Sequence, residues 1–88
     1  MSKQEKLLKK LLEIPRNFTF DELLTLMKSF GYTVENRGRS SGSAIMFYHP
    51  ELKDKIMIHR PHPEKEVKQY VLLMMIEKLR KNKMINED

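Results

Sequence analysis

The pattern of apolar and polar positions first predicts two amphipathic helices. Leucines gather on one face of residues 2–14, with lysines on the opposite face, and Pro15 ends this helix. We expect it to pack onto the rest of the chain, rather than contact a membrane or RNA. A second helix is expected to begin at Thr19, which forms a capping box with Glu22, and to stop at Gly31.

The pattern then changes to the alternation that half-buried strands show. Strands are expected at residues 32–36, 44–49 and 55–59, with a hairpin turn at 50–54. A last helix is expected over residues 63–81, because Pro63 suits a first turn and Glu64 and Glu66 suit its N-terminal end. This order predicts an α+β fold, a three-stranded antiparallel sheet packed against helices on one face.

Length and composition narrow the class of protein. The 88 residues are expected to form a single domain, residues 1–88. The 17 Lys and Arg against 12 Asp and Glu give a formal charge of +5, which favours an anionic partner such as RNA. The absence of cysteine excludes disulfides and thiolate metal sites. With no signal peptide and no apolar run of membrane-spanning length, we expect a cytoplasmic protein without membrane contact.

A cationic loop lies between the first two expected strands. Residues 37–43 read Arg-Gly-Arg-Ser-Ser-Gly-Ser. Arginine binds phosphate oxygens bidentately, and glycine lets the backbone approach a ligand closely. A solvated hairpin loop would also need glycine and serine for its turn, so the residue types leave both interpretations open. The spacing matches no nucleotide-binding fingerprint, and no ATP or NAD cofactor is expected.

His59 and His62 are the main titratable candidates. Imidazole exchanges protons near neutral pH, as RNA cleavage requires for activating a 2′-hydroxyl and protonating the leaving oxygen. Residue types alone slightly favour a structural or surface role for both. Two histidines without a nearby carboxylate provide too few ligands for a typical metal site, and no metal is expected. His49, which precedes Pro50 at a turn, is expected on the surface.

Three aromatic side chains are expected near the same face of the sheet, and aromatics on a sheet can stack bases. They are Tyr32, Phe47 and Tyr48. Strand aromatics fill a core more often than they bind RNA, and Phe47 is therefore assigned to the core. The seven methionines fall mostly on helical stripes and are interpreted as core residues.

Residues 20–85 resemble the HicA toxin family, the RNA-cleaving half of HicA–HicB toxin–antitoxin modules. The features that carry the resemblance are Phe-Gly-Tyr at 30–32, Gly-Ser at 42–43 and Ile-Met-Ile-His-Arg-Pro-His-Pro at 56–63, in this order and spacing. The resemblance implies a core over residues 19–85 that is similar to the double-stranded-RNA-binding domain. Residues 2–14 would then be an accessory N-terminal helix.

The resemblance also implies an activity and a partner. The family members are endoribonucleases, or mRNA interferases, that cleave mRNA without a metal or other cofactor and are neutralised by a HicB-like antitoxin. Their catalytic histidine follows the Gly-Ser pair, where this chain has Ala44. Three explanations of Ala44 stay open. It is a deliberate replacement, or this branch uses another residue there, with arginine the candidate, and places proton transfer on His59 or His62. The third is a natural pseudo-toxin that binds RNA or antitoxin without cutting.

These arguments assign a candidate site. Arg37, Arg39 and Arg60 are expected to hold phosphates, and Ser43 to position the scissile group. Position 44 and the imidazoles of His59 or His62 are expected to carry the catalysis. The alternative is a non-catalytic RNA-binding or protein-adaptor module, and Ala44 is its best support.

Overall fold

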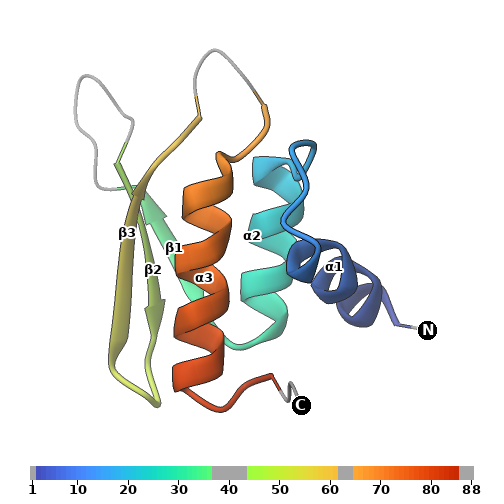
Figure 1. The fold of residues 1–88 in the computed structure, drawn as a ribbon. Coiled ribbons are helices and arrows are strands. Elements are labelled where there is room, and N and C mark those ends of the chain that lie inside the picture. The colour runs from blue at the N-terminus through green and yellow to red at the C-terminus, as the bar shows by residue number, and fades with distance from the viewer. Residues whose placement is uncertain (1, 37–43, 62–64, 86–88) are drawn as a thin grey trace.

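The computed structural model describes residues 2–36, 44–61 and 65–85. Its elements, in chain order, are α1 (Lys3–Leu12), α2 (Phe20–Ser29), β1 (Thr33–Asn36), β2 (Ala44–His49), β3 (Asp54–His59) and α3 (Gln69–Lys81). The strands form an antiparallel sheet in the order β1-β2-β3. The helices lie on one side of this sheet, with α1 farthest from it (Figure 1). The predicted α+β fold is confirmed.

The first two helices begin at the residues that the sequence indicates. The Ser2 hydroxyl accepts a hydrogen bond from the Glu5 amide at 3.1 Å and caps α1. At the start of α2 the Thr19 hydroxyl accepts from the Glu22 amide at 3.1 Å, and the Glu22 carboxylate accepts from the Thr19 amide at 2.9 Å. This reciprocal pair satisfies two amides that a helix start leaves without partners.

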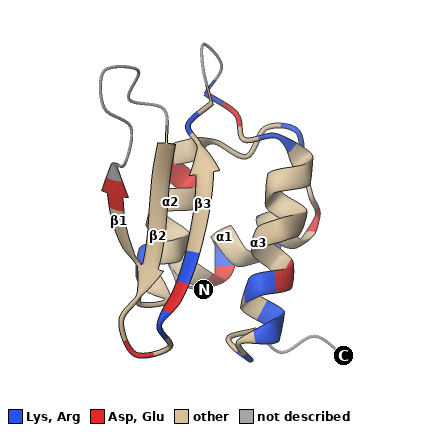
Figure 2. Ribbon diagram, turned by 90° about the vertical axis from the view of Figure 1, so that its left-hand side faces the viewer, with Lys and Arg blue, Asp and Glu red and all other residues tan. Residues whose placement is uncertain are grey.

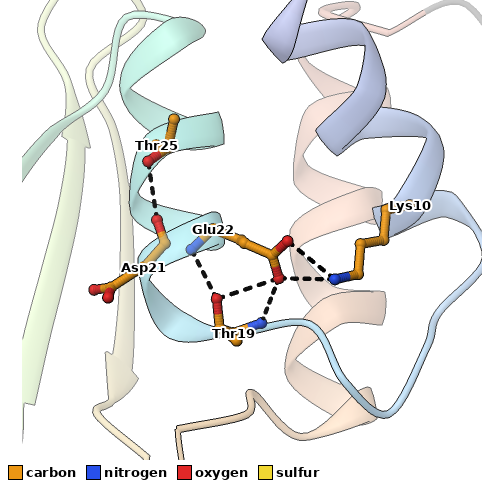
Figure 3. A network of polar contacts seen from close by, with 5 residues as sticks. All are labelled: Lys10, Thr19, Asp21, Glu22 and Thr25. Atoms are coloured by element: carbon orange, nitrogen blue, oxygen red, sulfur yellow. Dashed lines mark hydrogen bonds and ion pairs between the residues drawn. The ribbon is translucent and has the colours of Figure 1, made fainter.

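The Glu22 carboxylate also joins α2 to α1. The ammonium of Lys10 donates to both of its oxygens at 3.0 Å (Figure 3). Burial alone would raise the pKa of Glu22, but the bonds from Thr19 and Lys10 outweigh burial and hold that pKa below its ordinary value of 4.5. Leu7 and Leu11 of α1 are buried in the core, so α1 packs onto the rest of the chain as expected.

The core lies between the helices and the inner face of the sheet. It includes Phe18 just before α2, Leu23 within α2 and the strand aromatic Phe47, all fully buried. Alternation along β3 places Ile56 and Ile58 in this core and Met57, 56% exposed, on the outer face. Met57 therefore departs from the interpretation of the methionines as core residues.

The start of the last helix differs from its prediction, because α3 begins at Gln69 rather than at residue 63. Residues 65–67 instead pair with the segment that enters α2. The Phe20 amide donates to the Lys65 carbonyl at 2.9 Å, and the Val67 amide donates to the Phe18 carbonyl at 2.7 Å. An antiparallel bridge joins Thr19 and Glu66 between these two bonds. These hydrogen bonds between distant parts of the chain tie residues 65–67 to the segment before α2, so Glu66 is not in a helix. Pro63 and Glu64 lie outside the described residues.

The surface prediction for His49 is wrong. Its side chain is 7% exposed, and its Nε2 donates to the Phe30 carbonyl at 3.1 Å while its Nδ1 accepts from the Leu52 amide at 3.3 Å. Gly31 leaves room for the ring, since a Cβ at Gly31 would lie 2.8 Å from Nε2. The φ of Gly31 is +97°, a left-handed conformation that favours glycine. His49 occupies an inward position of β2, like Phe47 two residues before it.

Tyr32 is also buried, at 2% exposure, and does not lie on the open face of the sheet. Its hydroxyl donates to Asp54 at 2.8 Å, and Asn82 and Lys78 donate to the same carboxylate at 3.0 and 3.2 Å. Burial and the negative charge of Asp54 raise the pKa of Tyr32 to about 12. Burial would raise the pKa of Asp54, but its three donors outweigh burial and lower that pKa below 3.8.

Candidate nucleic-acid interface

The β2–β3 register brings the predicted catalytic position and one candidate imidazole together. Ala44 at the start of β2 is the direct partner of His59 at the end of β3. Side chains of directly opposed residues lie on the same face of a sheet, with Cβ atoms about 4.5–5.5 Å apart. This is the outer face, because Ile45 and Ile58, the next pair along, are buried in the core. A side chain larger than alanine at position 44 would therefore meet His59.

His59 is exposed, and within the described residues its ring makes no hydrogen bond or ion pair. It lines a hollow of about 190 Å³ between the end of β3 and the start of α3. Lys68, the N-terminal cap of α3, and Tyr70 in its first turn line the same hollow. Buried Val67 and Val71 supply apolar lining. The arrangement offers a proton-transfer group and a cation beside an apolar surface.

Arg60 separates this hollow from a second one. Its guanidinium carbon lies 5.3 Å from the centroid of the Phe20 ring, so the side chain extends towards the start of α2. The second hollow, about 440 Å³, lies there and is also lined by Asp21 and Lys65. Lys and Arg segments follow the end of β3 and precede α3 at the same end of the molecule (Figure 2). The described residues thus place Ala44, His59 and Arg60 at one end of the sheet.

Four predicted site residues lie outside the described residues. They are Arg37, Arg39, Ser43 and His62. Their assigned roles in phosphate binding, positioning and proton transfer stay predictions. Ala44 directly follows residues 37–43 in the sequence, and Arg60 and Pro61 separate His59 from residues 62–64.

Sequence reasoning missed Tyr70 and Lys68. Tyr70 is 67% exposed, the most exposed of the large apolar side chains in the described part of the chain. The available signal was its place just before Val71 on the buried stripe of α3, which puts an aromatic ring off the apolar face of that helix. Among residues 2–36, 44–61 and 65–85 no group of three or more His, Asp or Glu is arranged to hold a metal. No helix in these ranges is long and apolar enough to span a bilayer.

A comparison with protein families gives one match. The model described as HicA toxin of bacterial toxin–antitoxin matches residues 20–80. The match begins at the first residue of α2, leaves out α1 and includes the whole sheet and nearly all of α3. Searches of curated proteins and of solved structures gave no match.

Proposed function

Because the chain belongs to the HicA toxin family, we propose that it is a HicA-like toxin built as a metal-independent endoribonuclease that cleaves mRNA and is neutralised by a HicB-like antitoxin, with catalysis inactivated in this chain by Ala44. Family membership makes it the toxin of a toxin–antitoxin pair. The nuclease activity and the identity of the antitoxin go beyond what family membership gives, and each needs its own test. The net charge of +5 supports a polyanionic substrate.

The pairing of Ala44 with His59 is the observation that carries the nuclease proposal. Metal-free RNA cleavage removes a proton from the attacking 2′-hydroxyl and delivers one to the leaving 5′-oxygen. Alanine does neither. His59 faces that position across the sheet, is exposed and serves one of the two roles, as acid or as base. Arg60, together with Arg37 and Arg39, binds the phosphates, and Ser43 positions the scissile group.

The test is cleavage of a generic mRNA, without added metal, by this chain and by its Ala44→His and Ala44→Arg variants. Cleavage gained with either substitution is the expected result and identifies position 44 as part of the site. Cleavage by the parent chain itself would move the chemistry to His59 or His62, which His59→Ala and His62→Ala then separate. A bell-shaped dependence of the rate on pH would show that titrating groups carry it.

The second candidate function is a non-catalytic RNA-binding or adaptor module. Ala44 favours it, since the position that carries the family's catalytic residue holds no titratable group. It predicts RNA binding without cleavage by all three chains. RNA affinity must in either case fall steeply with salt, because phosphate contacts release counterions. An affinity unchanged between low and high salt would contradict phosphate recognition altogether.

The antitoxin is proposed to cover the same end of the sheet. An acidic partner surface would neutralise the cations there and exclude RNA at the same time. Arg39→Ala is then expected to weaken both RNA and antitoxin binding. If neither affinity changes, residues 37–43 serve only as a connecting loop.

A further inference from the structure

The hollow beside His59 has the size and chemistry of a subsite for one nucleotide. Its volume of about 190 Å³ is below the roughly 300–1,000 Å³ of pockets that enclose drug-sized ligands. It therefore suits one planar ring system rather than a whole cofactor. Lys68 supplies positive charge, Arg60 also lines the hollow, and among the described residues no Asp or Glu lines it. The larger hollow on the other side of Arg60 differs in this respect, because Asp21 lines it.

Tyr70 is the feature of this hollow that packing does not explain. Its neighbours Val71 and Leu72 are buried, whereas the Tyr70 ring is 67% exposed in the first turn of α3. Tyrosine is a poorer helix former than alanine or lysine, so helix propensity does not favour it there. A large exposed aromatic beside cations is the arrangement with which proteins bind unpaired bases, through stacking on the ring and charge contacts to the phosphate.

We propose that Tyr70 stacks on one unpaired base of a single-stranded RNA, in the hollow between β3 and α3. This proposal rests on the proposed function of the protein and names the form of RNA that its site takes. The phosphate next to that base then lies between Arg60 and Lys68, beside His59 and position 44. Bases within a duplex are stacked on each other and offer no free face to a side chain, so a helical RNA does not fill this subsite.

Tyr70 thus acts as a positioning residue and not as a catalytic residue. Its ring holds the base, and the base fixes where the adjoining phosphate lies relative to His59. The hollow is built on paired backbone, because residues 65–67 are hydrogen-bonded to the segment that enters α2. A rigid wall of this kind lowers the entropy cost of holding a nucleotide in one place.

The experiment measures the affinity of the full chain for a fluorescent single strand with 2′-O-methyl riboses, which lacks the attacking hydroxyl and cannot be cleaved. Tyr70→Ala is expected to weaken binding about 5- to 150-fold, which corresponds to about 1–3 kcal/mol for one stacked base. Tyr70→Phe keeps a ring and is expected to bind within about twofold of the parent. Leu73→Ala is the matched control, since Leu73 is 46% exposed on the same helix but does not line the hollow.

Three outcomes would overturn the proposal. The first is a Tyr70→Ala affinity within twofold of the parent while the parent binds RNA, which leaves the proposed function intact. The second is a loss of affinity with Tyr70→Phe or Leu73→Ala as large as the loss with Tyr70→Ala, or an equal loss from Tyr70→Ala when the ligand is a duplex of the same sequence. Either result removes stacking as the cause. The third is unchanged RNA binding with lost binding of the cognate antitoxin, which assigns the ring to a protein interface. No RNA binding by the parent chain would instead reject the proposed function, and the subsite with it.

Discussion

The two ends of the β2–β3 hairpin each carry a histidine, and the two residues have opposite environments. His49 ends β2, is 7% exposed and uses both ring nitrogens in bonds to Phe30 and Leu52. His59 ends β3, is exposed and has no hydrogen-bond partner within the described residues. The first ring is fully committed to holding the fold. The second ring is exposed and uncommitted within the described residues, and this difference separates a structural histidine from a candidate functional one.

The side chains around the two histidines differ in the same way as the histidines themselves. Around His49 the polar side chains of Tyr32, Asp54 and Asn82 are bonded to one another. Around His59 the cations Arg60 and Lys68 line hollows that are open to solvent. Polar groups that satisfy each other stabilise a fold, whereas groups left facing solvent are available for binding.

The largest expected effect comes from removing each ring in turn. His49→Ala leaves the Phe30 carbonyl and the Leu52 amide without their partner and opens a cavity, so we expect a loss of about 2–4 kcal/mol in the free energy of unfolding. His59→Ala, at an exposed site, is expected to change it by less than about 0.5 kcal/mol. Urea unfolding of both variants measures this. Equal losses would show that the two environments do not differ in the way described.

A smaller effect is expected from Gly31, which makes room for His49. Gly31→Ala places a Cβ 2.8 Å from Nε2 at a φ of +97°, and we expect a loss of about 1–3 kcal/mol. The clash vanishes when His49 is also alanine, so the double variant should lose less than the sum of the single losses. Unfolding of all three variants forms the thermodynamic cycle. Losses that add to within about 0.5 kcal/mol would mean that the two positions are not coupled.

The smallest expected effect is a dependence of stability on acid. The pKa of Asp54 in the folded chain is below 3.8, so its contribution is present above pH 3.8 and is lost as pH falls through the folded value. Asp54→Asn should remove part of this loss, about 0.5–1.5 kcal/mol. The acid-dependent loss of stability that remains in this variant is expected to come from Glu22, whose pKa is also lowered. Glu51→Gln, in the exposed turn, is the control for the change in net charge. Identical acid profiles for parent and Asp54→Asn would contradict the role given to the cluster.

Local sequence signals predicted the elements whose causes are local. Ser2, Thr19 with Glu22, and Gly31 mark helix ends through bonds and backbone conformations that span only a few residues. The strand boundaries agreed to within one residue, because alternation and turn composition act over short distances. The predicted turn at 50–54 brings the two strand ends together, but it would pair Ala44 with Arg60, one residue away from the observed partner His59. The neighbourhood of the candidate site was therefore accessible from the sequence, and the register was not.

The missed features depend on contacts between distant segments. The start of α3 is set by residues 18–20, which lie far away in the sequence from residues 65–67. The burial of His49 depends on Gly31, in the connection after α2, which no local pattern around Pro50 reveals. The exposure of Tyr70 depends on how α3 is turned against the sheet. Tertiary packing determines all three features, and it overrides the local propensity of the sequence.

The pairing of residues 65–67 with residues 18–20 has a consequence for the order in which the protein becomes competent during synthesis. The hollow beside His59 takes walls from the end of β3 and from α3, and the bridge that fixes them needs both halves of the chain. A nascent chain that still lacks α3 does not have the hollow. Base stacking in the proposed subsite therefore requires that the last helix has left the ribosome, and a chain ending at residue 61 should bind single-stranded RNA more weakly than the whole chain.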